Sequence, residues 1–176
     1  RSPALAGAVV RALVALAAAL AAGLSVRVDC LVVSTPEGRT AAVLPLGGPG
    51  DRDWSFSISF RHSVAKLPVE DFFRRSPGGM RLYRTVYKGL GAGLPFTDKA
   101  GTARLVDGAI VIDGLDREYR SFAVSASSFT EHRLTVRGVS YDLYALAGRA
   151  IVTLAIDRRP LMAALVGRLS MEGEAT

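Results

Sequence analysis

The run from Trp54 to Arg61 constrains the fold of this chain more than any other stretch. It reads WSFSISFR, so apolar side chains alternate with serines up to a final arginine. Successive side chains of a β-strand point to opposite faces, and the alternation therefore predicts a half-buried strand whose outer face is lined by serines. His62 has the same parity as the aromatic residues, which predicts that the strand carries an imidazole to the edge of its apolar side.

Short apolar segments separated by turn residues continue along most of the chain. Asp107-Gly108 between two such segments is the strongest hairpin signal, and a second hairpin is expected around Arg137-Gly138. A break is expected at Asp113–Asp116, and a helix after Pro160. The pattern predicts an all-β chain, mainly an antiparallel sandwich or partly open barrel, with an N-terminal hydrophobic helix and a short C-terminal helix. The predicted strands are 27–34, 40–46, 54–62, 69–74, 80–87, 102–106, 109–112, 122–126, 132–136, 141–146 and 149–156.

The first 26 residues differ from the rest of the chain. Residues 4–26 are apolar apart from Arg11, and no charge occurs between Ala12 and Val26. Such a segment is typical of a signal peptide behind basic residues, or of an uncleaved membrane anchor. We therefore divide the chain into residues 1–26, a signal peptide or anchor, and 27–176, a single β-rich domain. The positive-inside rule places that domain on the extracytoplasmic face of the membrane, or in the periplasm or outside the cell if the leader is cleaved.

Charge and composition exclude several functions. The chain has 22 basic and 16 acidic residues, but the arginines are scattered rather than clustered with aromatics, so no nucleic-acid partner is expected. A single cysteine, Cys30, and two histidines give no disulfide and no metal-ligand cluster, and we expect no cofactor. Cys30 is expected in a buried strand, and His132 at the surface before a strand.

Three interpretations fit the polar residues that follow the serine-lined strand. His62, Ser63 and Glu70 have the residue types of a hydrolase site, although neighbouring residues on a strand point apart. They also fit a buried polar cluster in which Glu70 orients His62. Third, they fit a ligand site completed by the glycine-rich loop of residues 88–98, whose glycines allow close backbone approach. No helix follows this loop, so it is not a phosphate loop.

These segments together resemble a bacterial family called domain of unknown function 1850, over about residues 28–157. The resemblance is carried by Phe60-Arg61-His62-Ser63-Val64, by Pro68-Val69-Glu70 and by Gly91-Ala92-Gly93-Leu94-Pro95. It implies a small protein with an N-terminal hydrophobic segment that works beside tripartite TRAP transporters of the TAXI type, whose binding proteins capture small organic anions. It implies no catalytic residues. The motif positions it marks are His62, Ser63, Glu70, Gly91, Ala92, Gly93 and Pro95.

We therefore expect an accessory or small-ligand-binding domain, with TRAP transporter subunits, a small organic anion and the membrane as partners. Its net charge of +6 favours an acidic solute or surface. The alternatives are a hydrolase that uses His62, Ser63 and Glu70, and a structural interaction module in which the motif serves the fold. An exposed imidazole in an open cleft favours binding or catalysis, whereas burial of both His62 and Glu70 favours the structural role.

Overall fold

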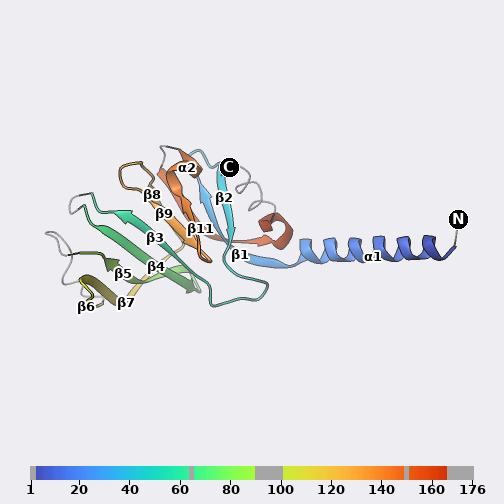
Figure 1. Ribbon diagram of the computed structural model, residues 1–176, viewed down its shortest axis with the longest axis horizontal. Helices are drawn as coiled ribbons and strands as arrows, with labels where there is room; N and C mark the ends of the chain where they lie inside the picture. The colour runs from blue at the N-terminus through green and yellow to red at the C-terminus, as the bar shows by residue number, and fades with distance from the viewer. Residues whose placement is uncertain (1–2, 64–65, 90–100, 149–150, 166–176) are drawn as a thin grey trace.

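The computed structural model describes residues 3–63, 66–89, 101–148 and 151–165. They form an open sandwich of two antiparallel sheets, from one end of which a long helix projects (Figure 1). The all-β class and the terminal helices are thereby confirmed, and the architecture is a sandwich rather than a barrel. The elements are α1 (Pro3–Ser25), β1 (Arg27–Ser34), β2 (Thr40–Pro45), β3 (Ser55–Arg61), β4 (Pro68–Ser76), β5 (Gly79–Tyr87), β6 (Thr102–Val106), β7 (Ala109–Tyr119), β8 (Ser121–Ser125), β9 (Arg133–Val136), β10 (Val139–Asp142), α2 (Leu143–Ala147) and β11 (Ile151–Pro160).

The small sheet has the strand order β2-β1-β11-β8, and the large sheet has the order β10-β9-β3-β4-β5-β7-β6. We call the end of the sandwich where α1 joins β1 the helix end, and the opposite end the far end. β3 starts at the helix end, because Trp54 just before it donates its indole N–H to Asp29 on β1 over 2.8 Å. β3 therefore ends at the far end, and β4 returns toward the helix.

The core lies between the inner faces of the two sheets. Leu31 and Leu154 of the small sheet and Leu134 of the large sheet are fully buried there. Burial of a leucine side chain stabilises a fold by about 1.5–3 kcal/mol. Phe56 and Ile58 of β3 belong to the same core cluster, so the predicted apolar face of this strand is confirmed.

A stack of aromatic rings links the two sheets. Phe73 on β4 stacks on Phe56 of β3 with 5.0 Å between ring centroids, and on Phe122 of β8 with 5.1 Å. Tyr119 meets Phe122 at 5.6 Å. Each such pair adds about 0.5–1.5 kcal/mol beyond the area that it buries. The stack therefore fixes the position of edge strand β8 above β3 and β4.

α1 projects away from the sandwich, and almost none of the helix is covered by the rest of the chain (Figure 1). Its segment Gly7–Ser25 has 19 residues, is long and apolar enough to cross a membrane, and is only 6% buried. At a rise of about 1.5 Å per residue such a segment spans roughly 28 Å, close to the thickness of a bilayer's hydrocarbon core. Leu24 and Leu13 are 62% and 59% exposed, so the helix does not contribute an apolar face to the core.

The C-terminal part of the described chain covers the outer face of the small sheet. Residues 161–165 are helical after Pro160, as predicted. Ala164 of this helix forms a second buried cluster with Val28 and Cys30 of β1. Cys30 is fully buried in a strand, as expected. Burial raises the pKa of its thiol to about 11, so the thiol stays protonated.

Two predicted elements are wrong. The break expected at Asp113–Asp116 does not interrupt β7, because β5 pairs with β7 on both sides of an irregularity that Gly114, with φ of +75°, accommodates. The strand expected at 141–146 ends at Asp142, and helix α2 follows. The Asp142 carboxylate caps α2 by accepting hydrogen bonds from the amides of Tyr144 and Ala145, which favours a helix start over further strand.

Candidate functional site

The first motif residues follow β3 at the far end of the sandwich. His62 is half-buried and Ser63 is exposed. The chain reverses tightly here: the amide of His62 donates to the carbonyl of Leu67, and the amide of Lys66 donates to the carbonyl of His62, both over 2.9 Å. Residues 64–65, which include Val64, lie outside the described part of the chain. His62 therefore stands at the edge of the sheet in a turn, one residue after the strand.

Glu70 lies on the outer face of the large sheet, with the serines. Its register partner is Ser59, and its Oε1 accepts a hydrogen bond of 2.9 Å from the hydroxyl of Ser57. Its Oε2 pairs with Lys88 Nζ at 3.7 Å. The carboxylate that was expected to orient His62 is thus engaged by Ser57 and Lys88, on the face opposite to the aromatic core.

The glycine-rich loop starts beside the His62 turn. The amide of Lys88 donates to the carbonyl of Pro68 over 2.8 Å, and Gly89, with φ of +135°, packs on Leu67 so closely that a Cβ would lie 3.0 Å from a leucine methyl. The two motif segments therefore approach each other at the far end. Residues 90–100 lie outside the described chain, so the predicted positions Gly91, Ala92, Gly93 and Pro95 are not placed.

A cleft opens between the sheets where β8 lies above β3 and β4. Its volume is about 340 Å³, within the range of about 300–1,000 Å³ that is usual for small-molecule sites. Apolar and aromatic side chains form most of the walls, and Asp71 and His132 bring the titratable groups. The lining residues are Ile58, Phe60, Asp71, Phe73, Phe122, Ala123, Val124, Ser125 and His132.

Asp71 is a carboxylate on the inner face of the large sheet. It pairs in register with Ile58 of the core and with Thr85, whose hydroxyl donates to Asp71 Oδ1 over 2.7 Å. Burial raises the pKa of the Asp71 carboxyl above its ordinary value, against the hydrogen bond from Thr85 and the positive charge of Arg117. A carboxyl of this kind in an apolar cleft is a typical sign of a functional site.

His132 forms another part of the cleft wall, and the expectation that it lies at the surface is right only in part, because the residue is half-buried. Its ring is half-buried and stacks on Phe60 of the motif, with 5.2 Å between centroids. Nδ1 lies 2.8 Å from the hydroxyl of Thr130. Burial lowers the pKa of His132, so the neutral imidazole is favoured at physiological pH.

The titration of His132 is the direct test of this placement. We expect its imidazole to titrate below the ordinary pKa of about 6.5, because burial disfavours the charged ring. The measurement is the pH dependence of the histidine ring signals by NMR. His132→Phe assigns the signal, since His62 is the only other histidine. A pKa for His132 at or above 6.5 would contradict a half-buried ring.

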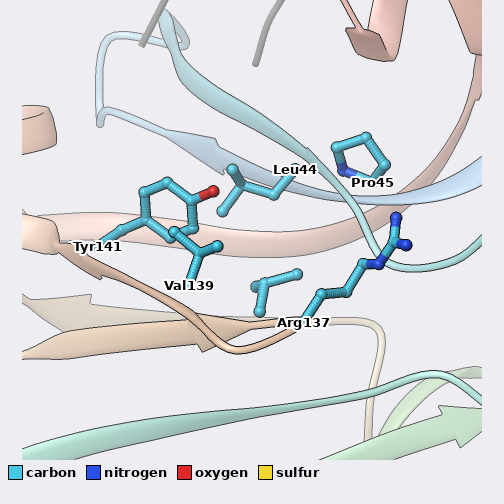
Figure 2. Close-up of a pocket in the computed structure, with 6 residues that line it drawn as sticks. Leu44, Pro45, Arg137, Val139 and Tyr141 are labelled. Carbon is cyan, nitrogen blue, oxygen red and sulfur yellow. The ribbon is translucent and has the colours of Figure 1, made fainter. Parts of the chain in front are cut away.

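A second hollow lies at the opposite edge of the sandwich, between β2 and β10. Figure 2 shows Leu44 facing Val139 and Tyr141, with Arg137 extending along one side toward Pro45. Its volume is about 200 Å³, below the usual size of a small-molecule site. Two further hollows beside Trp54, of about 410 and 350 Å³, are larger than the cleft of Asp71 and His132. We place the candidate site in that cleft because burial shifts the pKa of both titratable groups in its walls.

The sequence interpretation missed Asp71, although a signal was present. Val69, Asp71 and Phe73 share one parity on β4, and the flanking two are buried in the core. A charged residue at a core position requires a special environment. In the described residues, no group of three or more His, Cys, Asp or Glu side chains is placed to hold a metal ion.

The fold and the cleft define a class of protein: a small open β-sandwich with an apolar N-terminal helix and a titratable, aromatic-walled cleft between its sheets. Residues 56–143, half of the chain, match the family described as Domain of unknown function (DUF1850), and the chain belongs to this family. The match spans every residue that lines the cleft, whereas α1, β1, β2 and β11 lie outside it. Comparison with curated proteins and with solved structures gives no match.

Proposed function

We propose that this chain is an extracytoplasmic small-ligand-binding domain, tethered to the membrane by α1. The observation that carries the binding role is the Asp71 carboxyl, which faces an apolar cleft of about 340 Å³ beside a neutral imidazole. Burial of an incompletely compensated carboxyl is unfavourable for folding, and such groups concentrate where function requires them. The uncovered 19-residue apolar segment of α1 supports the tether.

The cleft favours a compact organic cation. An ammonium group beside Asp71 would compensate the carboxylate, and the apolar side chains around it would make this charge pairing stronger than in bulk solvent. The apolar body of the ligand would contact Phe60 and Phe122 on the walls. A carboxylate ligand would instead meet a like charge at Asp71, so the small organic anion expected from net charge suits this cleft less well.

A thermal-shift screen of the full chain in detergent tests the proposal. The panel consists of aromatic and alkyl amines, with dicarboxylates as the competing class. A ligand at about 100 times its Kd stabilises the native state by about 2.7 kcal/mol, which is roughly 5–10 °C for a chain of this size. We expect amines to raise the midpoint, and more so as pH rises, because Asp71 then loses the proton that competes with the cation.

Two adjacent carboxylates serve as matched variants. Asp71→Asn removes the charge that faces the cleft, and should abolish the shift caused by amines. Glu70→Gln makes the same change on the outer face, and should leave that shift in place. Loss of binding in Glu70→Gln alone would move the site to the motif turn at His62. A screen in which only dicarboxylates stabilise the protein would refute the cation site.

Association with TAXI-type TRAP transporters stays a prediction that rests on the family resemblance. An extracytoplasmic domain held at the membrane by one helix has the placement that an accessory subunit needs. Co-purification of the tethered chain with transporter subunits is the corresponding test, and a chain that extracts from its membrane without them would count against the accessory role.

A further inference from the structure

The junction between α1 and the sandwich is short and fixed. Only Val26 separates the helix from β1; its amide donates to Ala22 over 2.9 Å, and its carbonyl accepts from the amide of Leu161 over 2.8 Å. Gly23 of α1 packs on Met162 so closely that a Cβ would lie 2.7 Å from its Cγ. The junction therefore fixes the distance between the last apolar turn of α1 and the helix end of the sandwich, which lies directly beyond that turn.

Arginines gather around a small hollow at this end of the sandwich. The hollow has a volume of about 100 Å³, and β1, the end of β4, the end of β11 and the loop between β2 and β3 contribute to it. That loop lies beside the start of β1 in Figure 1. The residues around the hollow are Arg27, Val28, Asp29, Gly48, Gly50, Asp51, Arg52, Arg75 and Arg158.

Asp29 is the main internal counter-charge. Its Oδ2 accepts hydrogen bonds from the Trp54 indole at 2.8 Å and from Arg75 Nε at 3.3 Å. Its Oδ1 pairs with Arg158 Nε at 3.6 Å. One carboxylate therefore serves two guanidinium groups and an indole, and it has little capacity left for a further cation.

The remaining charges do not balance. Asp51 uses its Oδ1 within its own loop, where it accepts from the amide of Asp53 at 3.0 Å. Arg27 donates a hydrogen bond to the backbone carbonyl of Arg158, a group that carries no charge and so does not neutralise the guanidinium. The exposed Arg52 has no carboxylate partner among the described residues. The four arginines and two aspartates around the hollow leave an excess of two positive charges.

We propose that this hollow binds the phosphate of an anionic lipid headgroup. The 19-residue segment Gly7–Ser25, whose only charged residue is Arg11, ends at the boundary of the hydrocarbon core, so Arg27, two residues beyond it, lies in the headgroup layer. Arginine binds phosphate with several directed donors, and Arg52 and Arg27 are exposed on this side. The inference rests on the membrane tether in the proposed function, but not on the cleft ligand.

Native mass spectrometry of the full chain in nonionic detergent tests the headgroup site. The protein is offered equal amounts of phosphatidylglycerol and phosphatidylcholine, and we expect the anionic lipid to be retained preferentially. Arg52→Ser removes one guanidinium from the phosphate, so we expect it to weaken retention about five-fold. Arg27→Ser combined with Arg52→Ser should weaken retention further than either single change, because both arginines border the same hollow.

Arg39→Ser is the matched control, because Arg39 is equally exposed but lies in the turn after β1, at the far end. Equal weakening by Arg39→Ser, or equal retention of the two lipids, would overturn the headgroup site. So would full displacement of the lipid by inorganic phosphate, which would indicate a soluble-anion site. A separate experiment tests the tether: the chain is reconstituted in phosphatidylcholine vesicles and washed at alkaline pH. Release of the chain from these vesicles would refute the tether itself.

Discussion

Asp71→Asn is expected to stabilise the fold at neutral pH while it removes ligand binding. Burial raises the pKa of the Asp71 carboxyl, so the folded state holds the proton to higher pH than the unfolded state does. The free energy of unfolding of the native chain must then fall as pH rises from the ordinary pKa through the raised one. Asparagine carries no titrating proton and can still accept the hydrogen bond from Thr85.

The expected gain at pH 7 appears as a higher midpoint of thermal unfolding than that of the native chain at the same pH. The gain should be smallest near pH 4 and should grow toward pH 7, as measured by thermal unfolding in detergent at each pH. Greater stability together with lost binding is the trade-off expected of a functional carboxyl.

Asp113→Asn is the control, because the pKa of the Asp113 carboxyl is shifted in the opposite direction to that of Asp71. Hydrogen bonds from Arg84, and with a smaller effect from Arg104, lower the pKa of Asp113. Its contribution to stability is therefore present above the ordinary pKa and is lost as pH falls through the lowered one. The variant should not gain stability at pH 7. An Asp71→Asn variant that is less stable than the native chain at pH 7 would contradict a half-buried carboxyl that is incompletely compensated by its neighbours.

Gly79→Ala is expected to destabilise the fold strongly, although it adds only a single methyl group. Gly79 starts β5 with φ of +134°, a conformation that L side chains rarely adopt. An added Cβ would lie 2.6 Å from the carbonyl oxygen of Tyr119 and 3.2 Å from Arg120 Cα. Both neighbours are backbone atoms of the adjoining strand and its end, so relief requires the β5–β7 ladder to shift.

Strain at the dihedral angle costs about 1–3 kcal/mol, and the overlap adds to it, so we expect a loss of about 3–4 kcal/mol. Chemical denaturation followed by circular dichroism measures this loss. Gly38→Ala is the control: its φ is +80°, but an added Cβ meets no atom within 4 Å. It carries dihedral strain alone and should cost about 1–2 kcal/mol. Equal losses in the two variants would exclude the close approach at Tyr119.

Most of the strands could be predicted because their signals are local. The serine-aromatic alternation of β3 and the Asp107-Gly108 hairpin depend on side-chain parity and turn chemistry within a few residues. One failure is a local pattern overruled by a partner far along the chain, whereas the strand expected at 141–146 is ended by a local cap at Asp142. Gly114 resembles a break in the sequence, but β5 supplies hydrogen bonds on both sides of it and keeps β7 continuous.

The sequence analysis chose Glu70 as a site residue, whereas the carboxylate in the cleft belongs to its neighbour Asp71. Glu70 belongs to the motif and Asp71 does not, yet Asp71 faces the cleft and Glu70 faces solvent beside Ser57. Parity along β4 indicates which of the two points inward. It does not indicate that edge strand β8 lies above that point, or that Phe60 and His132 stack there, because residues 60 and 132 meet only through the pairing of β3 with β9.

The amino-acid sequence by itself determined most of the strands, the apolar N-terminal helix and the family, because period, turn residues and motif spacing are properties of short stretches. Only the tertiary structure decided which carboxylate faces a cleft, and that four arginines from separate segments surround one hollow at the helix end. The physical reason is that solvation and charge balance depend on every neighbour of a group, and in a sandwich most of those neighbours come from strands distant in the chain.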